Sequence, residues 1–426
     1  MKGSFLPFLL FANICYAQQI TGIKFEKNLS WTEIRQKAKK EHKSIFLDAY
    51  TTWCAPCRYM AVTIFSQNKV GNFFNKNFIN VAVQMDSTGK DNEDIKRWYK
   101  DAKMIADTYK VDVYPTYLFF NQDGILVHTI TGASDKANDF IEKAKDALDP
   151  KTQYSKLKED FFEKDKRDSA FLLLLINSAT TAGDDSALHT YINSYIASQK
   201  SLLTARNIEL IARGTSKSSD KGFDVLLNYP KEVEAVIGKE KRIRILNTIA
   251  FDEEIFPVIM INGKKTVYGG GLSIYGGGTM NKHVDWPAIK RKIDLKYHNL
   301  SNQIIFQGKL KYYDWLEDWE NFNALLLRYT SECNNIDTNL IDNMAGKLMQ
   351  DCKDKKYFND ATKWSEVLGK NEKHPYYLQT YGRLLYKAGK KNAAIKYIKK
   401  YASLIKTSNE STNDLIERMK EGEEIE

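Results

Sequence analysis

The sequence predicts an α/β sandwich with a mixed sheet over residues 18–150, followed by a mainly α-helical, repeat-like region over 151–426. Strand-like and helix-like stretches alternate up to about residue 150, and this part closes with a hairpin and a helix. Beyond it, apolar residues recur at helical spacing. A chain of 426 residues has room for two or three domains of about 150 residues each.

The α/β part contains each element that such a sandwich needs. A capping box of Ser30 and Glu33 predicts the start of its first helix. Two apolar stretches across the turn 121–124 predict the hairpin. In chain order we expect a short strand at 23–25, a helix at 30–41, a strand at 44–50, a helix from about 55, a strand at 81–85, a helix at 91–109, hairpin strands at 117–120 and 125–127, and a helix at 134–148.

The region after residue 150 is predicted to be helical. Asp168 can cap a helix that contains the apolar stretch 171–176. A weak repeat relates residues 359–364 to 392–397, and the stretch of about 338–405 resembles tetratricopeptide helical hairpins. An irregular helical domain is the alternative.

The region 263–287 interrupts these helices with two similar runs, Tyr268–Gly271 and Tyr275–Gly278. A phosphate-binding loop would need a following Lys-Ser/Thr pair or a strand–turn–helix setting, and neither is evident. We expect a flexible surface loop, with a ligand-binding loop (269–278) as the alternative.

The composition is that of an ordinary globular protein. Hydrophobic residues make up 43% and charged residues 27%, which excludes a wholly disordered or collagen-like chain. Five cysteines exclude a disulfide-dense scaffold. The net charge of +9 is spread along the chain without a basic arm, so we expect no nucleic-acid partner and only a weak preference for acidic partners or surfaces.

Residues 1–17 have the pattern of a signal peptide. Lys2 precedes the apolar run 5–12, and small residues lead to a cleavage site after Ala17. The run is too short to span about 30 Å of hydrocarbon. The pattern predicts export, to the periplasm if the source is Gram-negative and otherwise out of the cell.

Two alternatives stay open for this segment. It could remain as an uncleaved anchor, or Cys15 could carry a lipid, although Ile14 stands where lipoprotein signals normally need a small residue. No other run of 18 apolar residues occurs, so we expect no membrane span in the mature chain.

Cys54-Ala55-Pro56-Cys57 is the segment with the clearest chemistry. Half a zinc site would need two more ligands, but Cys333 and Cys352 are distant and the six histidines are scattered. Two cysteines three apart at a helix start can instead close a small ring reversibly. We expect a redox dithiol without a metal or another cofactor.

The run Trp53–Cys57 resembles the active site of thioredoxin-fold proteins, and the resemblance extends over about residues 20–150. Asp48, six residues before the first cysteine, matches the buried acid of that family. Tyr114-Pro115-Thr116 matches its cis-proline segment, and Gly132 matches the glycine before its last helix.

The sequence departs from the family pattern in two places. Ala55 stands where thioredoxins usually carry glycine. The stretch from Cys57 to Pro115 is longer than in a minimal thioredoxin, chiefly around 87–104.

The resemblance implies catalytic roles for Cys54, Cys57 and Asp48. A helix N-terminus would stabilise a thiolate on Cys54, which would attack a substrate disulfide. Cys57 would be the resolving thiol, and a buried Asp48 would take its proton. The alternative for Asp48 is a purely structural role.

The resemblance also implies a substrate-binding surface at Trp53, Tyr114 and Pro115. A cis bond before Pro115 would expose the backbone of Tyr114 beside the dithiol, where an extended substrate could pair as an added strand. Trp53 would shield one side of the dithiol. The alternative for Trp53 is an ordinary core position.

These features predict an exported thiol-disulfide oxidoreductase that reduces or isomerises protein disulfides. Asp48 favours reduction, as does the Ala-Pro pair, which resembles the Gly-Pro of reducing family members. Reduction requires an upstream thiol reductant. The helical region would select partners. A helical protein-binding scaffold, with the thioredoxin domain as a docking module, is the alternative.

The remaining cysteines, Cys333 and Cys352, each belong to the end of an apolar helical stripe. In an antiparallel hairpin they would lie about 18 Å apart, too far for a disulfide. We expect two mostly buried free thiols, with a bond to another chain as the alternative.

Overall fold

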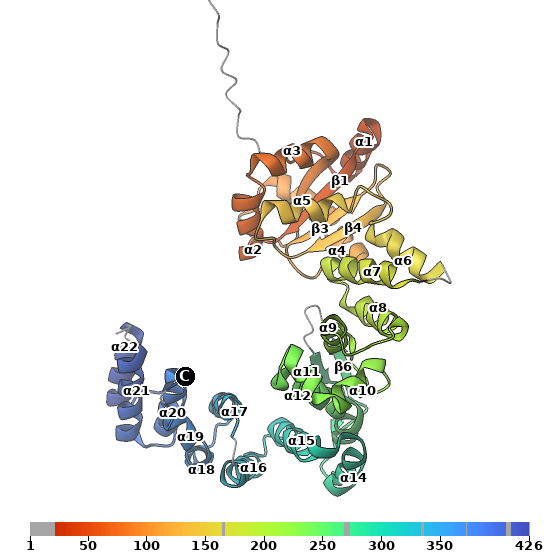
Figure 1. Cartoon of the computed structure of the whole chain (residues 1–426). Helices are drawn as coiled ribbons and strands as arrows, with labels where there is room; N and C mark the ends of the chain where they lie inside the picture. The colour runs from red at the N-terminus through yellow and green to blue at the C-terminus, as the bar shows by residue number, and fades with distance from the viewer. Residues whose placement is uncertain are drawn as a thin grey trace, which may run out of the picture. The chain divides into compact units, whose positions relative to one another are not determined.

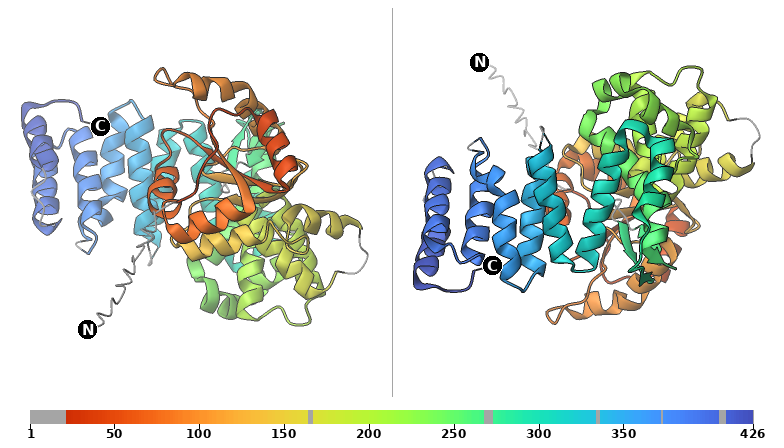
Figure 2. Two further views of the ribbon diagram at one scale, coloured as in Figure 1. Left: turned by 90° about the horizontal axis from the view of Figure 1, so that it is seen from above. Right: turned by 90° about the horizontal axis from the view of Figure 1, so that it is seen from below.

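The computed structural model describes residues 22–163, 167–267, 273–333, 336–371, 373–405 and 410–425. The predicted signal peptide (1–17) and the first glycine run (268–271) lie outside these residues. The chain forms two compact units (Figures 1 and 2). The first comprises Met1–Arg242 with Lys265–Ile274, and the second comprises Ile243–Lys264 with Tyr275–Glu426.

A four-stranded mixed sheet with the order β2-β1-β3-β4 forms the centre of the N-terminal α/β part of the first unit (Figure 1). Strand β1 is parallel to β2 and antiparallel to β3, and β3 is antiparallel to β4. The predicted α/β sandwich is therefore confirmed. The strands are β1 (Ser44–Tyr50), β2 (Phe78–Gln84), β3 (Thr116–Phe120) and β4 (Leu126–Thr131).

Helices cover both faces of this sheet, because successive side chains of β1 point to opposite faces. Ile45 and Leu47 belong to the apolar cluster that includes residues of α1 and α4. Phe46 belongs to the other cluster, where its ring lies 4.6 Å from Phe74 and 5.3 Å from Phe119. The helices are α1 (Trp31–Glu41) and α4 (Glu93–Tyr109) on one face, and α2 (Ala55–Tyr59), η1 (Met60–Ile64), α3 (Asn68–Asn77) and α5 (Ala137–Lys145) on the other.

Two strand predictions in this domain were partly wrong. The segment 23–25 forms a single bridge, from Phe25 to Asn80, because the chain turns at Asn28 (φ 60°) and enters α1. The strand predicted at 81–85 begins at Phe78, since α3 ends at the preceding residue and the chain becomes extended at once. The capping box of α1 and the β3–β4 hairpin are confirmed.

Helices α6 (Tyr154–Glu163) and α7 (Ser169–Ala182) pack on the edge strand β4. The first backbone N–H of α6, from Tyr154, donates to Nδ1 of the buried His128 at 3.2 Å. The Thr131 hydroxyl donates to the carbonyl of Ala182 at 2.8 Å. Packing of the α/β domain therefore continues past residue 150. Asp168 caps α7, as predicted.

The rest of the chain is largely helical, which confirms the second part of the predicted fold. The further elements of the first unit are α8 (Asp185–Ser198), α9 (Ala205–Gly214), α10 (Lys221–Asn228) and α11 (Pro230–Ile237), and α12 (Lys239–Ala250) continues into the second. The second unit contains η2 (Phe251–Ile255), α13 (Phe256–Ile259), α14 (Trp286–Tyr297), η4 (His298–Leu300), α15 (Ser301–Trp315), α16 (Trp319–Glu332), α17 (Thr338–Asp351), α18 (Lys356–Trp364), α19 (Glu366–Gly369), α20 (Pro375–Lys387), α21 (Lys391–Ile405) and α22 (Glu410–Glu421).

A helical hairpin lies where the sequence predicts tetratricopeptide-like repeats. Helices α20 and α21 pack together across a turn in which Gly389 has φ 80°. Gly382 faces the side chain of Ile398 so closely that a Cβ atom would clash with it. The assignment of a repeat family stays a prediction.

Part of the glycine-rich region forms strands, so the prediction of a loop over 263–287 was wrong at 264–267, 273–276 and 279–280. Strands β5 (Met260–Ile261) and β8 (Thr279–Met280) pair, as do β6 (Lys264–Val267) and β7 (Ser273–Gly276). The Tyr275 hydroxyl donates to Asp252 at 2.6 Å, which fixes β7 to η2.

Cys333 and Cys352 are both free, as predicted, but only Cys352 is buried. Each directly follows the end of a helix with an extended backbone, α16 for Cys333 and α17 for Cys352, but Cys333 does not pack against the core and the prediction that it is buried was wrong. Among the described residues no helix is long and apolar enough to cross a membrane.

The packing of α6 and α7 on β4 predicts that a fragment of residues 18–200 is more stable than one of residues 18–150. The shorter fragment exposes the apolar surface that Tyr154 and Leu157 cover, which we expect to lower the free energy of unfolding by about 2–4 kcal/mol. Urea titration of both fragments, followed by circular dichroism, measures the difference. Equal midpoints and slopes would contradict it.

Candidate active site

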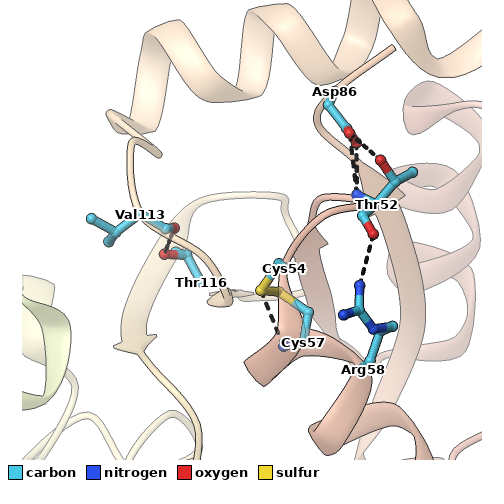
Figure 3. Close-up of a disulfide and its surroundings, with 7 residues drawn as sticks. All are labelled: Thr52, Cys54, Cys57, Arg58, Asp86, Val113 and Thr116. Carbon is cyan, nitrogen blue, oxygen red and sulfur yellow. Dashed lines mark hydrogen bonds between the residues drawn. A yellow bond between two sulfur atoms is a disulfide. The ribbon is translucent and has the colours of Figure 1, made fainter. Parts of the chain in front are cut away.

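The dithiol lies at the N-terminus of α2, directly after the sheet edge at which β1 ends (Figure 3). Cys54 is the N-cap residue with an extended backbone, and its sulfur accepts a hydrogen bond from the N–H of Cys57 at 3.1 Å. The two sulfurs form a disulfide across a Cα–Cα distance of 5.3 Å. Pro56 occupies the first turn of α2, where its missing N–H has no helical partner. Cys54 and Cys57 are only 2% and 7% exposed.

Trp53 is the exposed aromatic group beside the dithiol. Its side chain is 68% exposed, so the alternative of a core position is wrong. Its ring meets the ring of Tyr114 edge to face at 5.9 Å. The Tyr114–Pro115 bond is cis, as expected, and the Thr116 hydroxyl donates to the Val113 carbonyl at 2.8 Å. Figure 3 shows this segment facing the disulfide.

Asp48 is buried within β1, between Ala82 of β2 and Tyr117 of β3. It is two positions after Phe46, so its side chain points to the same face of the sheet, which η1, α3 and α5 cover. Burial raises the pKa of Asp48 to about 7, because a charged carboxylate is poorly solvated there. Burial, and secondarily the nearby Asp48, also raises the pKa of Tyr117.

A polar clamp that the sequence did not predict holds the residue before Trp53. The Asp86 carboxylate accepts the backbone N–H of Thr52 at 3.0 and 3.2 Å, and also its hydroxyl. The Arg58 guanidinium donates to the Thr52 carbonyl at 3.0 Å (Figure 3). Asp86 could have been found, because it follows a strand parallel to β1 and parallel strands end at the same sheet edge.

The longer segment after β2 has its own anchor at Asp91. The carboxylate of Asp91 accepts hydrogen bonds from the Thr88 hydroxyl at 2.6 Å, the Tyr99 hydroxyl at 2.7 Å and the Gln84 amide at 3.0 Å. The bonds from Thr88 and Tyr99 hold the pKa of Asp91 well below its usual range. This network fixes the loop that carries Asp86.

The polar side chains around the dithiol do not form a metal site. Throughout the part of the chain that the structure describes, no group of three or more His, Cys, Asp or Glu residues could hold a metal ion. The disulfide itself occupies the two sulfur atoms that a zinc site would use. The arrangement is suited to thiol-disulfide exchange, in which these sulfurs alternate between dithiol and disulfide.

Comparison with known proteins gives a consistent result. The family model described as a thioredoxin-like domain matches residues 32–148. Thioredoxin H5 of Arabidopsis thaliana is 25% identical over 113 residues, which cover 26% of this chain and 80% of that protein. A thioredoxin H-type of Fagopyrum esculentum is 30% identical over 103 residues, or 24% of this chain and 72% of that protein.

A solved structure with a similar fold is the solution structure of a candidate disulphide isomerase from Bacteroides thetaiotaomicron. It is 30% identical, covers 31% of this chain and 97% of its own, and has a TM-score of 0.26. The family model's match falls on the α/β domain with the Cys54–Cys57 disulfide. Through this N-terminal domain the chain belongs to the thioredoxin family.

Proposed function

We propose that this protein is an exported thiol-disulfide oxidoreductase that reduces or isomerises protein disulfides through Cys54 and Cys57. The observation that carries the proposal is the Cys54–Cys57 disulfide at the N-terminus of α2, beside the exposed Trp53. The apolar run and cleavage pattern of residues 1–17 support export, to the periplasm in a Gram-negative source.

The reaction starts from the reduced dithiol. The Cys54 thiolate attacks one sulfur of a substrate disulfide, forms a mixed disulfide and releases the other substrate sulfur as a thiolate. Cys57 then attacks the Cys54 sulfur and releases the second substrate thiolate. The substrate gains two electrons, and the enzyme is left with the Cys54–Cys57 disulfide seen in the structure. An upstream thiol reductant returns it to the dithiol.

Asp48 is proposed as the base that takes the proton from Cys57. Its place on the face of β1 covered by the helices after the dithiol supports this role. A carboxyl group with a pKa of about 7 can both accept and return a proton near neutral pH.

Trp53 and Tyr114 are proposed to bind the substrate backbone. The exposed ring of Trp53 packs edge to face against the half-buried ring of Tyr114, and the segment of Tyr114 and Pro115 leads directly into β3. Backbone pairing along this segment would accept many protein sequences. The helical region would then select partners.

The competing proposal is a helical binding scaffold with an inactive docking domain. The pairing of Cys54 with Cys57 favours the enzyme. Reduction of insulin disulfides by the purified full chain, with dithiothreitol as reductant, tests the choice. Turbidity from the released insulin B chain at the rate of dithiothreitol alone would refute the enzymatic function.

We expect Cys57→Ser to accumulate stable mixed disulfides on Cys54, because no thiol remains to resolve them. Cys54→Ser is the matched control and is expected to trap almost nothing. Non-reducing gel electrophoresis after incubation with disulfide-bearing proteins shows the trapped species. Equal trapping by both variants would refute the assignment of Cys54 as the attacking thiol and Cys57 as the resolving thiol.

Asp48→Asn is expected to change the pH dependence of stability. The folded protein binds the Asp48 proton more tightly than the unfolded chain, in which the group titrates near 4. The free energy of unfolding of the wild type therefore falls as pH rises from about 4 to 7, by roughly 4 kcal/mol at most. The asparagine variant does not lose stability in this way. With the Cys54–Cys57 disulfide formed in both proteins, we expect the variant to be more stable than wild type at pH 8 and similarly stable at pH 4.

The same variant separates stability from catalysis. We expect Asp48→Asn to slow insulin reduction by about 10- to 100-fold at pH 8, because Cys57 loses its proton acceptor. Urea titrations at pH 4 and 8 and rates from pH 5 to 9 provide the two measurements. An unchanged rate would assign Asp48 a structural role only.

A further inference from the structure

The helical part of the first unit contains an open groove of about 940 Å³. Helices α7, α9 and α11 and the start of α12 line it. Its apolar floor combines Leu173 of α7, Leu210 of α9, and Val236 and Ile237 of α11. All four side chains are partly exposed, so the groove keeps apolar surface accessible.

The sequence of α7 explains why this floor is apolar. The run 171–176 is apolar at every position, and Leu172, Leu175 and Ile176 are buried. Leu173 lies on another side of the helix and faces the groove. A helix that is apolar all round is normally covered on all sides, and the groove leaves one side of α7 uncovered.

Cationic side chains surround the apolar floor. Arg206 and Arg213 of α9 and Lys241 of α12 line the groove with Glu209, giving three positive charges against one negative. The three cations are exposed, and none of them forms an ion pair with any described residue. The neighbouring Arg242, in contrast, is buried and paired with Glu234 at 2.8 Å.

The spacing along α9 gives the charges a defined geometry. Arg206, Glu209, Leu210 and Arg213 follow the i, i+3, i+4, i+7 pattern, so they share one helical face. Arg206 and Arg213 are two turns apart, or about 10.5 Å along the axis. Each guanidinium can bind a carboxylate with two parallel hydrogen bonds.

We propose that this groove binds an acidic amphipathic helix of a partner polypeptide. Apolar side chains of the partner would lie on Leu173 and Leu210, and two carboxylates seven residues apart would meet Arg206 and Arg213. An anionic membrane is a poorer match, because lipid-binding surfaces usually carry four to eight cations and no acid such as Glu209. The identification of this partner as a redox substrate rests on the proposed function, but binding itself does not.

The test uses a fluorescein-labelled 15-residue helical peptide without cysteine, in which two glutamates seven positions apart flank a pair of leucines. Fluorescence anisotropy with the full chain measures its affinity. We expect a peptide with lysines in place of the glutamates to bind at least tenfold more weakly. The double variant Arg206→Glu/Arg213→Glu should lose at least tenfold in affinity for the acidic peptide.

Arg291→Glu/Lys292→Glu is the matched control, because it makes the same charge change at two exposed positions of α14. It should bind the acidic peptide like the wild type. Circular dichroism reports whether each variant folds. If the groove variant does not fold, Glu209→Lys takes its place, and we expect it to bind the acidic peptide about three- to tenfold more tightly.

Several results would overturn the proposal. They are an absence of peptide binding at 1 mM, and equal losses in the groove and control variants. If the protein binds phosphatidylglycerol vesicles and not the peptide, the groove is a membrane-binding surface. If the wild type self-associates and the groove variant alone does not, the groove binds a second copy of the chain. Because the peptide has no cysteine, these outcomes are independent of insulin reduction.

Discussion

Burial of β1 on both faces is the constraint on which the first unit depends. Its side chains alternate between two apolar clusters, so helices must cover both sides of the sheet. Phe46 alone contacts rings from α3, α5, β2 and β3. A strand held in this way ends at a defined place, and the dithiol follows immediately after it. The position of Cys54 is thus a consequence of core packing.

The same burial sets the properties of the site. Asp48 shares a face with Phe46, and the lack of solvent there raises its pKa to about 7. Beyond the sheet edge the chain is exposed, and hydrogen bonds take the place of packing. Asp86 accepts the backbone N–H of Thr52 and Arg58 donates to its carbonyl, so the loop leading to Trp53 and Cys54 has a fixed path. Apolar packing and polar clamping therefore act in succession along one short segment.

The helical region begins as an extension of the sheet rather than as a separate body. Helices α6 and α7 cover β4, and His128 joins them to it through the N–H of Tyr154. The next helices of the same unit carry the groove with Arg206 and Arg213. Under the two proposals above, the groove binds one segment of a partner polypeptide while the dithiol exchanges a disulfide in another segment of the same partner.

Local patterns in the sequence determined the elements with strong periodicity or capping, including α1, β1, the β3–β4 hairpin and α7, and the Cys54–Cys57 pair. These depend on neighbours in the chain, so spacing and residue type suffice to predict them. The exposure of Trp53 and Cys333, the short strands at 260–280, and the clamp of Thr52 by Asp86 were decided only in the tertiary structure. Each depends on residues far apart in sequence or on where a helix ends, and a linear pattern does not record which surfaces meet.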